Sequence, residues 1–133
     1  MKTTILVKTG NERGWRVPTV TAYRNEDELR MLLKDSPELL PGDDASRPVV
    51  LAHEFPVTFG SVDLVGVSPT GALTVVECKL RANSEIRRTI VGQLFAYAAA
   101  MWEMTYEEFD EAWQIRTKQP PPGGDNQPAC GRL

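Results

Sequence analysis

The sequence predicts an α/β domain in which helices flank a small mixed β-sheet, with the element order ββ-α-βββ-α-α. A length of 133 residues, 41% of them hydrophobic, suits one domain with a continuous core. Three β-prone runs follow one another between residues 47 and 80. Segments on either side of these runs repeat apolar residues with the period of a helix. Residues 1–117 are therefore expected to form a single domain.

The first ββ pair is expected near the N-terminus. Residues 3–8 and 15–23 are β-prone and are separated by the turn-like sequence TGNERG. Pro18 has no backbone N–H to donate, so it confines the second segment to a sheet edge or to an irregular strand.

The first helix is expected in residues 25–44, which read NEDELRMLLKDSPELLPGDD. Asn25 is a favourable N-cap, and Glu28 lies where a capping-box carboxylate can accept the N–H of the cap residue. The prolines that follow end the helix. Its apolar face consists of Leu29, Leu32 and Leu33.

Three strands are expected next, at residues 47–55, 59–67 and 71–80. Two helices follow, at residues 83–104 and 106–115, the first with a cap at Asn83 or Ser84. Residues 118–133 are rich in proline, glycine and polar residues, and they are expected to be a disordered tail or a linker. The residues expected to serve the core or an interface are Trp102, Phe109 and Trp113, and His53 is expected to be structural.

The composition limits the classes of function. A formal net charge of −3 argues against a domain that holds nucleic acid by bulk electrostatics, although Lys79, Arg81, Arg87 and Arg88 form a local basic cluster. No apolar run approaches the roughly 20 residues that span a bilayer, and the N-terminus does not resemble a signal peptide. The two cysteines do not suggest a disulfide framework. A cytoplasmic protein that binds no membrane is expected.

The run TVVECKL, residues 74–80, places charge inside an expected strand. Side chains two apart in a strand face the same way, so Glu77 and Lys79 share one face and Cys78 points to the other, as a core residue. Burying unpaired charge costs roughly several kcal/mol, so these side chains need partners or a ligand.

The expected hairpin supplies a second acid. The register that matches Val67 with Leu73 also places Asp63 directly opposite Glu77. Two facing carboxylates repel each other unless a divalent cation lies between them, and hard cations prefer carboxylate and carbonyl oxygens. The pair is therefore interpreted as half of a metal site.

The same residues carry a family resemblance. An acid in one strand and Glu-x-Lys in the next, with an acid-bearing helix before them and a Gln-bearing helix after, resembles the PD-(D/E)XK nuclease superfamily. ELLPGDD, VECK and EIRRTIVGQLFAYAA are similar to uncharacterised bacterial relatives of the RecB-like endonucleases, over residues 25–104. The superfamily core usually adds a fourth strand after the Gln-bearing helix, where this sequence has a short acidic helix and a proline-rich segment. The alternatives are that this strand is absent, that the protein continues beyond this sequence, or that a partner chain completes the sheet. The matching residues are Glu26 or Glu28, Asp63, Glu77, Lys79 and Gln93.

This resemblance implies a restriction-endonuclease-like core and a Mg²⁺- or Mn²⁺-dependent DNA endonuclease that acts in repair or defence. Asp63, Glu77 and the backbone carbonyl of Cys78 would bind the metal, which would lower the pKa of a bound water. Lys79 would orient or deprotonate that water, a role open to an amine with a depressed pKa. Gln93 would orient Lys79 or the water.

The resemblance also implies a third acid and a DNA surface. Glu26 is expected to be that acid and to bind the metal directly or through water, because it projects from the end of the apolar stripe, whereas Glu28 has a capping role and is the alternative. Arg81, Arg87 and Arg88 would contact DNA phosphates. A homodimer is expected, because an acidic domain would bind DNA weakly on its own.

Each assignment has a structural alternative. Glu77 and Lys79 could form the solvated face of an edge strand, and Gln93 could be a hydrogen-bonded core amide. Arginines in the first turn of a helix could simply be solvated. The competing function is a non-catalytic module with the nuclease fold that binds DNA or another protein.

Overall fold

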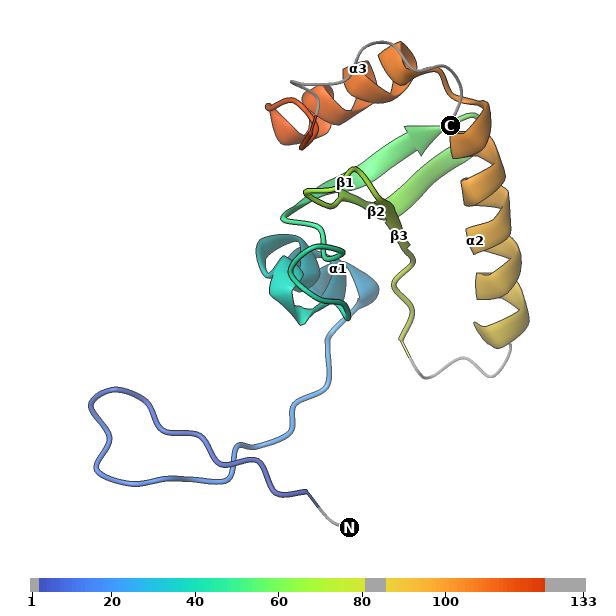
Figure 1. Ribbon diagram of the computed structural model, residues 1–133. Helices are drawn as coiled ribbons and strands as arrows, with labels where there is room; N and C mark the ends of the chain where they lie inside the picture. The colour runs from blue at the N-terminus through green and yellow to red at the C-terminus, as the bar shows by residue number, and fades with distance from the viewer. Residues whose placement is uncertain (1–2, 81–85, 124–133) are drawn as a thin grey trace.

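The computed structural model describes residues 3–80 and 86–123, and its elements follow the order α-βββ-α-α (Figure 1). This part of the predicted order is confirmed. None of the described helices is long and apolar enough to cross a membrane. The elements are α1 (Glu26–Asp35), the 3₁₀ helix η1 (Pro37–Leu39), β1 (Val50–Val57), β2 (Gly60–Val67), β3 (Leu73–Val76), α2 (Ile86–Glu103) and α3 (Tyr106–Thr117).

The three strands form one sheet in the order β1-β2-β3. Val67 pairs with Leu73 and Val65 with Val75, so the predicted register of the second hairpin is confirmed. The prediction of a mixed sheet is wrong for the described residues. Both pairings are antiparallel, because a short hairpin connection joins only antiparallel strands.

Helices cover both faces of the sheet (Figure 1). On one face, Leu29 and Leu33 of α1 pack on Leu64 and on Cys78, which is buried as predicted. On the other face, α2 and α3 cover a larger cluster. Its residues include Phe55, Val65, Tyr97, Met101, Phe109 and Trp113.

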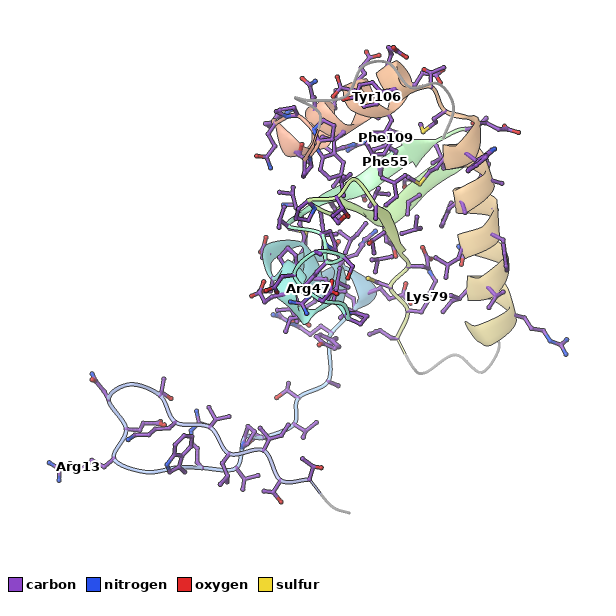
Figure 2. The ribbon with its side chains drawn as sticks, in the orientation of Figure 1. Arg13, Arg47, Phe55, Lys79, Tyr106 and Phe109 are labelled. Carbon is purple, nitrogen blue, oxygen red and sulfur yellow. The ribbon has the colours of Figure 1, made fainter. Side chains whose placement is uncertain are left out.

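Two of the four aromatic residues of the larger cluster, Phe109 and Trp113, lie in α3. Phe109 is buried with its ring centroid 5.1 Å from that of Phe55 (Figure 2), and Trp113 is fully buried. Their predicted place in the core is confirmed. Trp102 instead is 71% exposed on the outer side of α2. A core role for Trp102 is therefore excluded in this structure.

The sheet changes its facing pattern at Glu54. In β1, Ala52 and Phe55 both belong to the cluster under α2 and α3, although side chains three apart in a regular strand point to opposite faces. Glu54 lies between them with φ of 49°, an uncommon conformation for a residue with a side chain. In β2, Val62 and Val65 are also three positions apart and both face this cluster. The irregularity therefore falls beside Asp63.

The N-terminal arm, defined here as residues 3–24, does not form the expected pair of strands. It runs out from the start of α1 and back, away from the sheet (Figure 1). Within the arm, Val7 and Arg16 form an isolated antiparallel bridge. The prediction of two strands is wrong, because neither face of the hairpin is buried and an isolated hairpin is marginal in water.

The helices begin and end at other residues than predicted where capping interactions set their ends. α1 begins after Asn25, whose side chain accepts the N–H of Glu28, and it ends at Asp35, before Pro37. α3 has a full capping box between Thr105 and Glu108. Residues 124–133, most of the predicted tail, lie outside the described part of the chain.

Candidate active site

The site lies where β3 leaves the sheet. The ladder ends at the pair Leu64–Val76, so the predicted direct pairing of Asp63 with Glu77 is not formed. Instead, the backbone N–H of Cys78 donates to Oδ2 of Asp63 at 2.8 Å. The Asp63 carboxylate thus accepts a backbone N–H just beyond the last strand pair. This hydrogen bond fixes the segment that carries Glu77.

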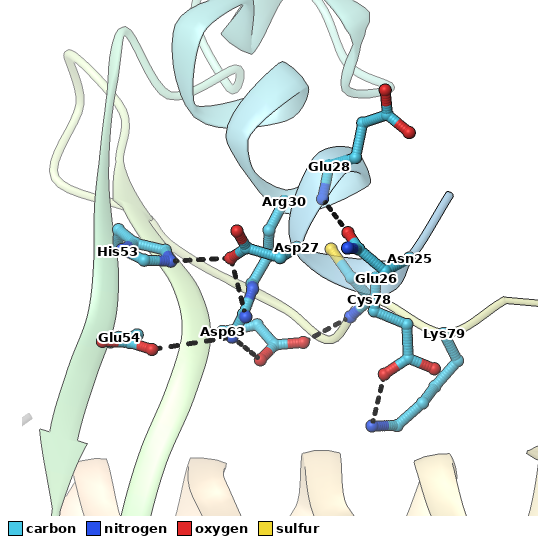
Figure 3. Close-up of polar contacts among 10 residues, drawn as sticks. All are labelled: Asn25, Glu26, Asp27, Glu28, Arg30, His53, Glu54, Asp63, Cys78 and Lys79. Atoms are coloured by element: carbon cyan, nitrogen blue, oxygen red, sulfur yellow. Dashed lines mark hydrogen bonds and ion pairs between the residues drawn. The ribbon is translucent and has the colours of Figure 1, made fainter. Parts of the chain in front are cut away.

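Arg30 of α1 neutralises Asp63 from the other side (Figure 3). One guanidinium nitrogen lies 3.0 Å from Oδ1 of Asp63 and 4.0 Å from Glu54, and the other lies 2.9 Å from Asp27. Burial lowers the pKa of Arg30, but the charge of Asp63 and the bond to Asp27 outweigh burial and raise it. Asp63 is therefore held between the Arg30 guanidinium and the backbone N–H of Cys78.

His53 lies at the edge of this group. Its Nε2 is 3.9 Å from Asp27, beyond hydrogen-bonding distance, and the ring is three-quarters buried in β1. The position agrees with the structural role expected of His53.

Glu77 is the most deeply buried acid of the site, with 3% of its side chain exposed. Lys79 lies 3.0 Å from its Oε1. The other oxygen, Oε2, is buried and has no hydrogen-bond partner among the described residues. A buried carboxylate oxygen without a donor is costly, so this atom marks a position where a cation or a donor would be favourable.

Lys79 is protonated more firmly than the sequence suggested. The hydrogen bond to Glu77 raises its pKa, burial opposes this, and the charges of Glu77 and Glu26 raise it further. The expectation of a depressed pKa is wrong, because the two carboxylates outweigh a modest desolvation. At neutral pH Lys79 is an ammonium that donates hydrogen bonds, and it is unsuited to removing a proton.

Glu26, and not Glu28, faces this group. Its carboxylate lies 3.4 Å from the Lys79 ammonium and accepts the backbone N–H of Leu80 at 3.2 Å. The carboxylate of Glu28 points away (Figure 3) and accepts the backbone N–H of Arg24 at 2.6 Å. The structure thus places Glu26, the helix acid that the sequence favoured, next to Lys79.

Gln93 enters the same region from α2. Its side chain is partly buried, and its Oε1 has no hydrogen-bond partner among the described residues. Tyr97 follows one turn later and is buried beside it. Burial raises the pKa of the Tyr97 hydroxyl, as do the charges of Glu77 and Asp63, while a hydrogen bond from Gln93 lowers it. The predicted inward orientation of Gln93 is confirmed.

The predicted DNA-contacting arginines are only partly described. Arg81 lies outside the described residues, and of Arg87 only the backbone position in the first turn of α2 is given. Arg88 is exposed in the same turn. Its exposure agrees equally well with a phosphate contact and with a solvated face.

Two residues of the site were not identified from the sequence. Arg30 follows Glu26 by four positions and Asp27 by three, so it shares their helix face, yet such spacing usually indicates a surface ion pair. Tyr97 follows Gln93 by four positions on the inner face of α2. In both cases the helical spacing from an already chosen residue was the available signal.

The donor set suits a hard divalent cation in type. Oε2 of Glu77 is buried and has no donor in the described part of the chain, whereas both oxygens of the Asp63 carboxylate already accept, from Arg30 and from the N–H of Cys78. Across residues 3–80 and 86–123, no three His, Cys, Asp or Glu side chains cluster as a ready ligand set. Mg²⁺ needs fewer, because it commonly uses one or two carboxylates and keeps several waters.

Comparison with known proteins leaves the site to be interpreted from its own geometry. No protein-family model, curated protein or solved structure matches this chain.

Proposed function

We propose that the protein is a cytoplasmic, Mg²⁺- or Mn²⁺-dependent deoxyribonuclease that hydrolyses phosphodiester bonds in DNA repair or defence. One observation carries the proposal: the buried Glu77 carboxylate pairs with Lys79 through one oxygen, and its other oxygen has no donor among the described residues. Most buried carboxylate oxygens in folded proteins have a donor, so an unpaired one on a side chain that is 3% exposed supports a ligand site. An oxygen left open beside an ammonium suits the binding of a ligand.

The residues of the site have distinct roles in this proposal. Asp63, Glu77 and the carbonyl of Cys78 would hold the metal, which would activate a water and stabilise charge on the scissile phosphate. Lys79, as an ammonium, would orient that water or donate to a phosphate oxygen, while Glu26 holds Lys79 in place at 3.4 Å. Gln93, whose Oε1 has no hydrogen-bond partner within residues 3–80 and 86–123, would orient the water.

DNA and a second copy of the chain are the proposed partners. Arg81, Arg87 and Arg88, near the start of α2, would contact phosphates, and each such contact strengthens binding at low salt. A homodimer would double these contacts on a chain whose formal net charge is −3.

Cleavage assays test the proposal. Purified protein with Mg²⁺ or Mn²⁺ should cut plasmid, single-stranded or branched DNA, and the Lys79→Ala variant should not. Calorimetry should detect metal binding in the wild type that Glu77→Gln weakens. If no substrate is cut with either ion and calorimetry shows no metal binding, the nuclease proposal is wrong.

A non-catalytic binding module is the second candidate, and the ion pair of Arg30 with Asp63 favours it. A guanidinium 3.0 Å from Oδ1 already neutralises one carboxylate that a metal would use. The Arg30→Met variant separates the two candidates. In a nuclease it should bind metal at least as tightly as the wild type, because a competing cation is removed. A module whose carboxylates only stabilise the fold should show no metal binding in either protein, and a module that binds metal without turnover should cut no DNA.

A further inference from the structure

The N-terminal arm exposes apolar side chains that the other described residues do not cover. Trp15 is 68% exposed and Val17 66%. The bridge between Val7 and Arg16 is the one strand-like pairing within residues 3–24. Exposed apolar side chains next to unpaired backbone edges are the features by which one chain pairs with another.

The tip of the arm combines an aromatic side chain with positive charge. Arg13 and Arg16 flank Trp15, and the arm holds four basic residues against one acid, Glu12. Arg13 projects outward from the tip (Figure 2). Trp and Arg are among the residues that carry most of the binding energy at protein interfaces. The tip is therefore suited to an acidic groove with an apolar floor.

A groove of about 440 Å³ at the opposite end of the molecule has this character. It lies between α2, α3 and the end of β1, in a region where residues 103–111 hold five acids and no base. Trp102 and Tyr106 in the same corner are 71% and 56% exposed. The lining includes the apolar Pro56, Met104 and Ile115 and the acidic Glu103, Glu108 and Glu111.

We propose that the arm tip of a second copy of this chain docks in this groove, with Trp15 on the apolar floor and Arg13 and Arg16 against the glutamates. This inference rests on the homodimer of the proposed function and names its contact surface. It does not depend on the nuclease chemistry. Opposite charges at the two surfaces would favour encounter and fix the register of the contact.

The arrangement of the molecule favours a second copy as the occupant. The arm leaves the body at the start of α1, whereas the α2–α3 corner lies at the other end (Figure 1). The arm would have to reverse at α1 and cross the whole body to reach its own groove. Two copies lying antiparallel about a two-fold axis instead place each arm beside the other's groove, so both contacts close symmetrically.

The oligomeric state tests the proposal. Sedimentation equilibrium of the wild type should show a monomer–dimer equilibrium below about 100 μM. Trp15→Ala and, separately, Glu103→Lys with Glu111→Lys should each raise the dimer Kd about tenfold or more. Matched controls are Val20→Ala in the stem of the arm and Asp35→Lys with Glu38→Lys, an equal charge change near the end of α1. Glu108 is left unchanged because it caps α3. Circular dichroism verifies that each variant is folded.

A mixing experiment identifies exchange between copies. The Trp15→Ala variant keeps its groove, and the groove variant keeps its arm, so an equimolar mixture can form one intact contact and should dimerise more tightly than either variant alone. A monomer at all concentrations, a dimer that neither variant weakens, or a mixture no tighter than its components would overturn the proposal. The readout contains no DNA, so its failure leaves the nuclease proposal to the cleavage assay.

Discussion

Two hairpins in this chain have opposite surroundings. The hairpin of β2 and β3 has four paired residue positions and buries apolar side chains on both faces, under α1 and under α2 and α3. The N-terminal arm also runs out and back around a polar turn, but it has one bridge and exposes almost every side chain. Strand-forming residues are present in both, so the difference lies in what covers them.

This contrast shows where the stability of the molecule resides. Strand pairing in the body, defined here as the described residues from 25 onward, is stabilised by burial. The reason is that β-propensity largely reflects packing against neighbours on a half-buried surface. The arm has no such contacts with the other residues that the structure describes. Equivalent substitutions in the two regions should therefore have unequal effects on the free energy of unfolding, and the following pairs of variants compare them.

The largest difference is expected between two tryptophans. Trp113→Ala should lower the free energy of unfolding by about 3–5 kcal/mol, because it removes a fully buried side chain from the core under α3. Trp15→Ala should leave the stability of the monomer unchanged, since that side chain is 68% exposed. Urea unfolding of dilute protein measures both. Equal losses for the two variants would mean that the arm packs on its own body.

The second pair compares ion pairs. Asp63→Asn should cost about 1.5–3 kcal/mol, because Asp63 accepts from Arg30 and from the N–H of Cys78 while largely buried. Glu12→Gln, which breaks the exposed pair of the arm with Arg16, should have no measurable effect. Unfolding in low and high salt checks this. Strong salt sensitivity of the Asp63 contribution would contradict its buried character.

The third pair compares glycines. A methyl group at Gly66 of β2 would lie 2.5 Å from Cβ of Pro48 and 2.7 Å from Cδ2 of Leu51, so Gly66→Ala should cost about 1–3 kcal/mol. At Gly10 of the arm nothing lies within 4 Å, and Gly10→Ala should be neutral. Thermal unfolding of both variants measures the difference. A neutral Gly66→Ala would mean that Pro48 moves aside easily.

The sequence predicted the body better than the arm for the same reason. Two β-prone runs joined by a short connection predicted the register that places Val67 opposite Leu73, because the length of a hairpin loop fixes the register of its strands. The same type of signal failed for residues 3–8 and 15–23. The sequence of a segment does not show whether another element of the fold will cover it.

The sequence indicated part of the arrangement of the site but not its electrostatics. Helix spacing predicted that Glu26 projects toward the strand face bearing Asp63 and Glu77, and its carboxylate lies 3.4 Å from the neighbouring Lys79. The depressed pKa expected of Lys79 was wrong, since the outcome depends on the distances to two carboxylates, which a sequence does not contain. Arg30 was missed for a related reason: an arginine three or four residues from acids is usually a surface partner, and its reach to Asp63 follows only from how α1 packs.

The last prediction is a pH dependence of stability that arises just beyond the buried hairpin, at Cys78. Burial is the largest cause that raises the pKa of Cys78 to about 11 from 9.0; the charges of Asp63, Glu77 and Glu26 add to it, and Arg30 opposes them. The folded state therefore keeps the thiol proton that the unfolded chain releases. This contribution to stability is complete below pH 9.0 and is lost as the pH rises toward about 11.

Cys78→Ala in a Cys130→Ser background isolates this contribution. The variant should be less stable at every pH because a buried side chain is shortened, but its stability should fall less steeply between pH 9.0 and about 11 than that of the Cys130→Ser protein. Lys79, whose raised pKa also makes stability fall in alkali, is present in both proteins, so its effect cancels in the difference. Urea unfolding in metal-free buffer at several pH values gives the two slopes. Parallel curves would show that the thiol ionises equally well in the folded protein, and Cys78 would then lie in contact with water, as the side chains of the arm do.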